Sequence, residues 1–276
     1  ADGVLVNNDT LPITGSAEYN SKDVATANQI TFTPDAITEG NYRLAATEKV
    51  TITGAKINKR TITIASVQVT PKQYDGDTNA WSCITGVTFN GLVNGDELFK
   101  NGEYNGSYVV KDYGITKATF DDANVGNHTI TGKVGLVNNN LNYTFGSEDE
   151  TAAFTTTGSI TQADSWALTP VNDLTIRYNN RDPQTYTPNW STLLPTGQIW
   201  TYNSENTAYT GSANLSTNTI GADTGVLSYQ LSAGNAGDTV TWTITASCSN
   251  YQTFTLTVTL SLIARDPQTN FKFENN

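Results

Sequence analysis

Side chains that carry out chemistry are scarce in this sequence. Its 276 residues include one histidine, His128, two cysteines and no methionine. It contains no Gly-x-Ser-x-Gly elbow, no Walker loop and no cluster of histidines and cysteines, which excludes the commonest nucleophilic, phosphate-binding and zinc sites. His128 has the same parity as Ile130 and Val134, so we interpret it as an inward-facing or edge residue of a strand rather than a general base. A glycosidase needs only two carboxylates, but acids held in turns suit that role poorly. We therefore expect no enzyme, no metal and no cofactor.

Positive charge is also scarce. Fifteen Lys and Arg stand against twenty-six Asp and Glu, and the net charge of -11 repels nucleic-acid phosphates and anionic membranes. No apolar run of eighteen residues and no signal peptide is present. We expect no nucleic-acid partner and no direct membrane insertion, and we interpret the chain as a piece of a longer protein, monomeric within it.

Cysteine usage provides no disulfide framework. Cys83 and Cys248 fall in different predicted domains, so only domains folded back on each other would pair them. Two buried free thiols are the favoured interpretation.

Threonine alternating with apolar residues is abundant. From Thr239 to Ala246, and again from Phe254 to Leu262, apolar side chains occupy every second position, with threonine or serine between them. Successive strand side chains point to opposite faces, so each segment has one apolar face and one hydroxyl-bearing face. The apolar faces need a second sheet across them, which predicts a β-sandwich. No convincing helical stripe extends over ten residues, so the whole chain is predicted to be all-β.

An internal repeat relates the first two parts of the chain. The segment 19–24 is similar to 120–125, and the similarity continues through Ile30-Thr31 and Ile130-Thr131, Asn41-Tyr42 and Asn142-Tyr143, and Thr53-Gly54 and Thr157-Gly158. Residues 1–62 are therefore predicted to repeat the second half of a unit spanning 63–163 and to lack its opening strands. Within that unit the parity slips between Ile64 and Val67, which predicts a bulge or a domain junction at Ala65-Ser66.

The unit 63–163 resembles the YDG repeat of large bacterial surface proteins and haemagglutinin-like adhesins. The residues that carry the resemblance are, in order, Tyr74-Asp75-Gly76, Gly86-Val87, Asn94-Gly95-Asp96, the segment 120–126 and Asn142-Tyr143. The unit departs from the family at Asp77, where a threonine is common, which puts the local turn in doubt. The resemblance implies a surface location and no catalytic role.

The motif residues are interpreted as structural. Asp75-Gly76 and Asn94-Gly95 are turn dipeptides, because glycine takes the positive φ that tight turns need. We expect Tyr74 and Tyr143 to bury their rings and to hydrogen-bond the backbone through their hydroxyls. Asp96 and Asn142 complete this structural set.

The third unit, 164–265, has the pattern of an immunoglobulin-like sandwich. Strand-like segments recur about every ten residues with turn residues between them. Residues 266–276 are interpreted as a tail or as the start of a further repeat, because Arg265-Asp266-Pro267-Gln268-Thr269 repeats residues 181–185.

Aromatic residues in the third unit leave a rival interpretation open. Trp190, Trp200 and Tyr202 are candidates for stacking on a sugar face, as in a carbohydrate-binding module. Loop tryptophans more often cover the end of a sandwich, and this structural role is favoured.

Two further chemistries stay open. Asp75, Asp77, Asp121, Asp122 and Asn124 offer the oxygen ligands that calcium prefers, although no complete calcium loop is present and solvated turn acids are favoured. Surface modules of similar kind sometimes carry Lys–Asn isopeptide bonds, which residue spacing does not reveal.

Taken together, the sequence predicts tandem immunoglobulin-like β-sandwich modules. They are expected to form a non-catalytic stalk or spacer, with adhesive surface, in a large bacterial cell-surface or secreted adhesin-like protein. The expected location is extracellular, and the expected partner is a glycan or protein of a host or of the environment. The alternative is a carbohydrate-binding module of an extracellular glycan-processing protein.

Overall fold

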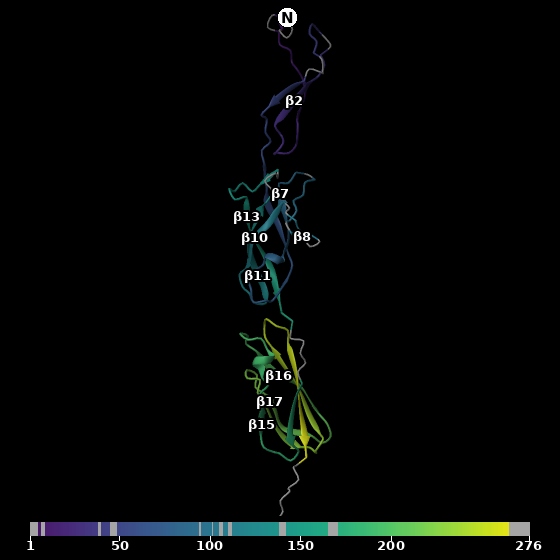
Figure 1. Ribbon diagram of the computed structural model, residues 1–276, viewed down its shortest axis with the longest axis vertical. Helices are drawn as coiled ribbons and strands as arrows, with labels where there is room; N and C mark the ends of the chain where they lie inside the picture. Colours follow the sequence, from purple (N-terminus) through teal and green to yellow (C-terminus); the bar gives the residue numbers. More distant parts are fainter. Residues whose placement is uncertain are drawn as a thin grey trace, which may run out of the picture. The chain divides into compact units, whose positions relative to one another are not determined.

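The computed structural model describes residues 5–6, 9–37, 40–44, 49–93, 95–100, 102–104, 107–109, 112–137, 142–164 and 171–264 (Figure 1). Its regular structure is nearly all strand, with one short α-helix, α1 (Trp190–Leu193), and one 3-10 turn, η2 (Trp81–Cys83). The predicted all-β fold class is confirmed.

Contacts divide the chain into two compact units. The first comprises Ala1–Thr70, Asn79–Asp121 and Thr129–Gly158, and the second comprises Pro71–Thr78, Asp122–His128 and Ser159–Asn276. Three short segments of the predicted unit 63–163, namely 71–78, 122–128 and 159–163, thus belong to the second compact unit. The module boundaries at 62, 163 and 265 stay a prediction.

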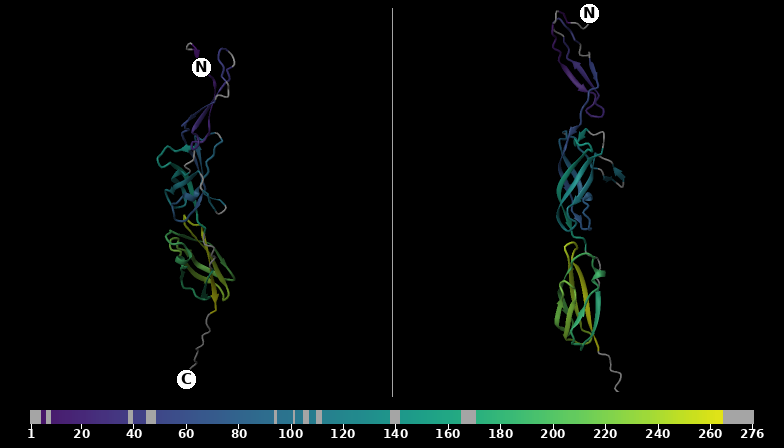
Figure 2. Two further views of the ribbon diagram at one scale, coloured as in Figure 1. Left: turned by 45° about the horizontal axis from the view of Figure 1, so that its top comes forward. Right: turned by 90° about the vertical axis from the view of Figure 1, so that its left-hand side faces the viewer.

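The second unit contains a two-layer sandwich built around the threonine-rich hairpin (Figure 2). Its larger sheet has the order β14 (Val171–Arg177), β20 (Phe254–Ile263), β19 (Thr239–Ser247) and β16 (Thr201–Tyr209). The smaller sheet has the order β15 (Gln184–Tyr186), β18 (Leu227–Ala233) and β17 (Asn214–Ile220). The yellow strands in Figure 2 belong to the larger sheet.

The core of this sandwich follows from the alternation. In the register of β19 and β20, Trp242 pairs with Val258 and Ile244 pairs with Leu256, and all four are fully buried. The smaller sheet contributes Leu227, Tyr229 and Leu231 to the same core. The indole N–H of Trp242 donates to Asn218 Oδ1 at 2.7 Å, so the polar atom of this buried ring is satisfied. The second sheet that the apolar faces required is present.

The first unit contains two related sheets. The strands β1 (Gly15–Tyr19), β2 (Gln29–Pro34) and β3 (Val50–Thr53) form one antiparallel sheet. The other has the order β10 (Tyr113–Phe120), β11 (Gly126–Leu136), β13 (Thr151–Thr161) and β6 (Lys72–Gln73). The division into units assigns β6, the start of β11 and the end of β13 to the second unit. The first unit also contains three two-stranded sheets. They are β5 (Thr63–Val69) with β7 (Ile84–Asn90), β4 (Arg60–Thr61) with β12 (Tyr143–Thr144), and β8 (Gly102–Tyr104) with β9 (Ser107–Val109).

The internal repeat is present in the strand register. Tyr19 pairs with Ile30 in β1 and β2, as Phe120 pairs with Ile130 in β10 and β11. The predicted bulge near Ala65-Ser66 is confirmed, because the β5–β7 register shifts between Ile64 and Ser66.

The two copies differ in what covers them. Phe120 is 2% exposed, whereas its counterpart Tyr19 is 43% exposed. A Cβ built on Gly158 would lie 3.1 Å from Val69 of β5, which shows how closely the β5–β7 pair packs on the second copy. Among the described residues, β1, β2 and β3 form a sheet of their own with no such pair. The predicted lack of opening strands in the first copy stays a prediction.

Candidate functional site

A buried tyrosine closes a tight turn in the second repeat copy. The hydroxyl of Tyr143 donates to Asp96 Oδ2 at 2.6 Å and accepts from the backbone N–H of Val93 at 3.0 Å. Gly95 has φ of 90° within this turn, a value that L side chains rarely adopt. Burial, together with the hydrogen bond to Asp96, raises the pKa of Tyr143 above its ordinary value. The site therefore holds the hydroxyl in its neutral, donating form.

The first copy contains the same turn closure. The hydroxyl of Tyr42 donates to Asp9 Oδ2 at 2.8 Å and accepts from the backbone N–H of Val6 at 2.9 Å. The signal in the sequence is the match of Leu-Val-Asn-Asn-Asp at 5–9 with Leu-Val-Asn-Gly-Asp at 92–96, which was not among the predicted repeats. Tyr42 and Tyr143 are thus equivalent in structure as well as in sequence.

Beside Tyr143, the side chain of Asn142 holds a turn of the first copy. Its Oδ1 accepts from the backbone N–H of Val24 at 2.8 Å, and its Nδ2 donates to Asp23 Oδ1 at 2.9 Å. We call this two-bond contact of one asparagine with an Asp/Asn-Val turn an asparagine clasp. It lies wholly within the first unit.

A second asparagine clasp lies within the second unit. Oδ1 of Asn250 accepts from the backbone N–H of Val125 at 3.0 Å, and its Nδ2 donates to Asn124 Oδ1 at 2.9 Å and to Gln198 Oε1 at 3.0 Å. In the repeat, Asn124-Val125 is the counterpart of Asp23-Val24. Asn250-Tyr251 therefore takes the place that Asn142-Tyr143 takes in the first clasp. This match was not predicted from the sequence, because the dipeptide alone is too short a signal.

The Tyr74-Asp75-Gly76 motif lies next to the second clasp. The ring of Tyr74 packs edge-on against Tyr251 with centroids 5.5 Å apart, and its hydroxyl accepts from Gln198 Nε2 at 3.2 Å. This partner is a side chain rather than the expected backbone group, and Tyr74 is half-buried. Gly76 has φ of 80°, as the turn interpretation requires.

The acid of the motif is held locally. Oδ1 of Asp75 lies 2.8 Å from Lys72 Nζ and accepts from the backbone N–H of Asp77 at 2.9 Å. Partial burial alone would raise the pKa of Asp75, but the bonds from Lys72 and Asp77 lower it below its ordinary value. Asp75 thus stabilises its own turn.

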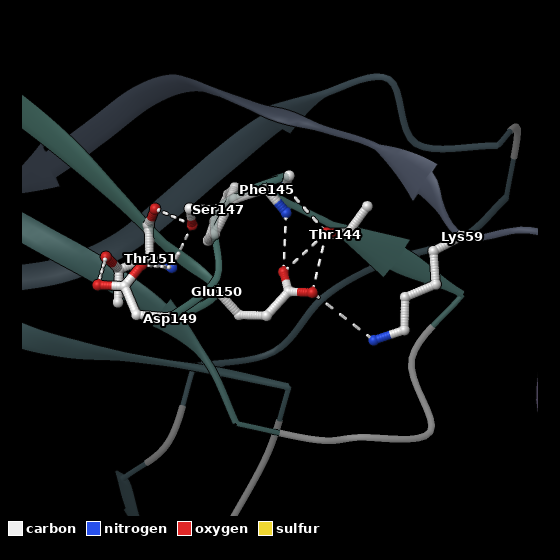
Figure 3. Close-up of polar contacts among 8 residues, drawn as sticks. Lys59, Thr144, Phe145, Ser147, Asp149, Glu150 and Thr151 are labelled. Atoms are coloured by element: carbon white, nitrogen blue, oxygen red, sulfur yellow. Dashed lines mark hydrogen bonds and ion pairs between the residues drawn. The ribbon is translucent and has the colours of Figure 1, made fainter.

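The loop that follows Asn142-Tyr143 is fixed by Glu150 (Figure 3). Its carboxylate accepts from Thr144 Oγ1 at 2.9 Å and from the backbone N–H of Phe145 at 3.0 Å, and it lies 3.8 Å from Lys59 Nζ. Among the described non-glycine residues, only Glu150 has a positive φ, 49°. These bonds offset the cost of that conformation and hold the loop beside the first clasp.

The candidate sugar-stacking aromatics pack within the sandwich. Trp190 and Tyr202 face each other with ring centroids 4.6 Å apart, and the indole N–H of Trp190 donates to Gly225 O at 3.2 Å. Tyr202 belongs to the buried core, and Trp190 and Trp200 pack against it. Trp81 is different: its side chain is 56% exposed while its indole N–H donates to Ile115 O at 3.0 Å. Trp81 was not predicted as a site residue from the sequence.

The remaining candidates for chemistry are His128 and the two cysteines. His128 Nε2 lies 2.7 Å from the backbone O of Asn124. Cys83 and Cys248 form no disulfide; Cys83 is buried, as expected, whereas Cys248 is only half-buried. Among the described residues, no group of three His, Cys, Asp or Glu side chains is placed to hold a metal ion. No helix in the described ranges is long and apolar enough to cross a membrane.

Comparison with known families adds one assignment. The family model "YDG domain" matches residues 58–153. A YDG domain is found at residues 58–153. It contains Asn142 and the turn at Val125, so each clasp includes a residue of the YDG domain. A search of curated proteins finds no match.

Several solved structures similar to this chain are cadherin ectodomains. The human desmocollin-1 ectodomain is 13% identical, with 86% of this chain and 47% of that chain covered and a TM-score of 0.29. Protocadherin gammaB7 EC3-6 is 13% identical, with 85% and 56% covered and a TM-score of 0.31. Mouse cadherin-23 EC22-24 is 11% identical, with 92% and 85% covered and a TM-score of 0.29. The chain spans about half the length of the first two, and its all-β assignment rests on its own strands.

Proposed function

We propose that this chain is a non-catalytic repeat region of a large bacterial cell-surface or secreted adhesin-like protein. In this proposal it acts as a stalk or spacer and presents adhesive surface outside the cell. The YDG domain and the β-sandwich are compatible with such a repeat or adhesion region. The observation that carries the proposal is the asparagine clasp, which occurs twice at equivalent positions.

The chemistry of the clasp suits a structural repeat. The amide of one asparagine satisfies a backbone N–H and a side-chain oxygen of the turn, so the only side-chain requirement in the turn is an Asp or Asn. Each hydrogen bond contributes about 0.5–1.5 kcal/mol net, and leaving a buried partner unpaired costs about 1–3 kcal/mol. Such a contact can be used again from module to module without a dedicated ligand.

Adhesive surface is proposed separately, from the exposure of Trp81. Its ring is accessible while its N–H is bound, so one face is available for stacking at little cost in side-chain entropy. Trp190 and Tyr202 pack against each other and the core instead, and no specific contact favours the carbohydrate-binding alternative in their region.

Display on a cell surface tests the spacer role. The chain is placed between a membrane anchor and an epitope, and binding of a large antibody to the epitope is measured. We expect the antibody to bind when the chain is present and to lose binding when it is deleted. Equal binding without the chain would contradict the spacer role.

Binding and turnover assays test the other parts of the proposal. Glycan and protein arrays are probed with the unaltered chain, Trp81→Ala and Trp190→Ala, and polysaccharide turnover is measured in parallel. Loss of a binding signal with Trp81→Ala alone supports the adhesive surface, whereas loss with Trp190→Ala alone supports the carbohydrate-binding alternative. Turnover by the unaltered chain would overturn the non-catalytic role.

A further inference from the structure

Asn41 occupies the clasp position of the first repeat copy. Its neighbour Tyr42 makes the same two hydroxyl bonds as Tyr143, to an aspartate carboxylate and to a valine N–H. Asn41 precedes Tyr42 as Asn142 precedes Tyr143. The geometry that presents Asn142 to a turn is therefore also built around Asn41.

Among the described residues, the side chain of Asn41 binds no turn, unlike its counterparts Asn142 and Asn250. Asn142 and Asn250 each bind an Asp/Asn-Val turn, and their side chains are half-buried and buried. Asn41 is exposed, and no hydrogen bond of its side chain is found in the part of the chain that the structure describes. The sequence has two Asp/Asn-Val dipeptides, Asp23-Val24 and Asn124-Val125, and both are already bound.

We propose that Asn41 is the acceptor half of a third clasp, which binds the Asp/Asn-Val turn of a preceding YDG-type module. This inference rests on the proposed repeat function. The required partner is a backbone N–H directly preceded by a residue with a carboxylate or amide oxygen, presented on a turn like 21–26. Asn41 Oδ1 accepts from that N–H, and Nδ2 donates to that oxygen.

The uncovered sheet beside Asn41 points to the same partner. In the second copy, the β5–β7 pair covers the apolar face of the sheet, and the first copy has no such pair among the described residues. A module placed directly before Leu5, with its turn and strands in the same order as in residues 9–91, would supply both the missing strand pair and the turn. The repeated Leu-Val-Asn-x-Asp segments at 5–9 and 92–96 define where the added module would join the chain. Gly91 directly precedes Leu92, so the last residue of the added module would directly precede Leu5.

The test extends the whole chain by one copy of that segment. Residues 9–91 are duplicated and joined directly ahead of Leu5, and amide hydrogen exchange is measured by NMR at the added and original copies of Val24. In the extended chain, Asn41→Ala is made in the original copy only, and Asn142→Ala is made separately. Asn41→Ala is also made in the chain without the added segment, as the matched control. The control shows whether the substitution alone disturbs folding.

We expect Asn41→Ala to speed exchange at the added Val24 about tenfold, the loss of one hydrogen bond. Asn142→Ala is expected to do the same at the original Val24. Asn41→Ala in the original chain is expected to change no exchange rate. If Asn142→Ala has its effect and Asn41→Ala does not, the third clasp is wrong while the repeat function stands. If neither has an effect, the clasps and the repeat function fall together.

Discussion

The side chain of Asn142 accepts a hydrogen bond from the backbone N–H of Val24, 118 positions earlier in the chain, at 2.8 Å. The same contact recurs between Asn250 and Val125, which are 125 positions apart, at 3.0 Å. Neither pair is local, and each brings an asparagine-tyrosine dipeptide onto a turn more than a hundred positions earlier in the chain. The recurrence indicates a single structural solution used twice.

Removing either asparagine should lower stability. We expect Asn142→Ala to reduce the free energy of unfolding by about 1–2 kcal/mol, and Asn250→Ala by about 2–3 kcal/mol, because Asn250 is buried and its loss leaves more partners unpaired. Denaturant titration of each variant measures this difference. Asn41→Ala is the control and should change stability by less than about 0.5 kcal/mol. Equal effects of all three substitutions would contradict the account.

A negative charge in place of the clasp asparagine should affect the two clasps differently. Asn142→Asp places a carboxylate against Asp23, whereas Asn250→Asp faces the neutral amide of Asn124. Like charges at hydrogen-bond distance repel, and salt screens this repulsion where the pair is partly exposed. We therefore expect added salt to recover more stability for Asn142→Asp than for Asn250→Asp. The opposite order in thermal unfolding would count against the assigned partners.

Alkaline stability should depend on Tyr143. Burial and the bond to Asp96 raise the pKa of its hydroxyl, so its contribution to stability is fully present below the ordinary value of about 10. That contribution is lost as the pH rises from about 10 through the raised pKa. We expect Tyr143→Phe to be less stable at neutral pH. We also expect its free energy of unfolding to fall less steeply as the pH rises through the alkaline range. If denaturation at several pH values gives the same alkaline slope for both proteins, Tyr143 does not cause the loss of stability.

Isoleucines in the sheets of the two copies should differ in their importance for stability. Ile130 is fully buried under the β5–β7 pair, whereas Ile52 on β3 is 55% exposed. We expect Ile130→Ala to cost about 2–5 kcal/mol, and Ile52→Ala less than about 1 kcal/mol. Denaturant unfolding of both variants measures the ratio. Similar costs would mean that something covers the first copy.

The strands were predictable from the sequence because their apolar face and their threonine face alternate without interruption. Trp242 and Leu256 are buried where their parity places them, and the slip in parity at Ala65-Ser66 is a register shift in the β5–β7 pair. The parallel pairing of β14 with β20 was not predictable in this way. Alternation fixes which face a residue takes and leaves the neighbour and direction of its strand open.

The candidate site was predictable only in part. The resemblance to the YDG repeat identified Asn142 and Tyr143, but the partners of Asn142 lie more than a hundred positions away, and residue spacing carries no information about such contacts. Asn250 was missed because the sequence around it differs from that around Asn142. Trp190 has a loop-like sequence context, yet its ring packs on Tyr202.

The most direct test of the clasp is amide hydrogen exchange at Val24 and Val125 in the unaltered chain and in Asn142→Ala and Asn250→Ala. The account predicts slow exchange at both amides, with Asn142→Ala accelerating Val24 alone and Asn250→Ala accelerating Val125 alone, each about tenfold. Fast exchange at both amides in the unaltered chain, or no response to either substitution, would contradict it.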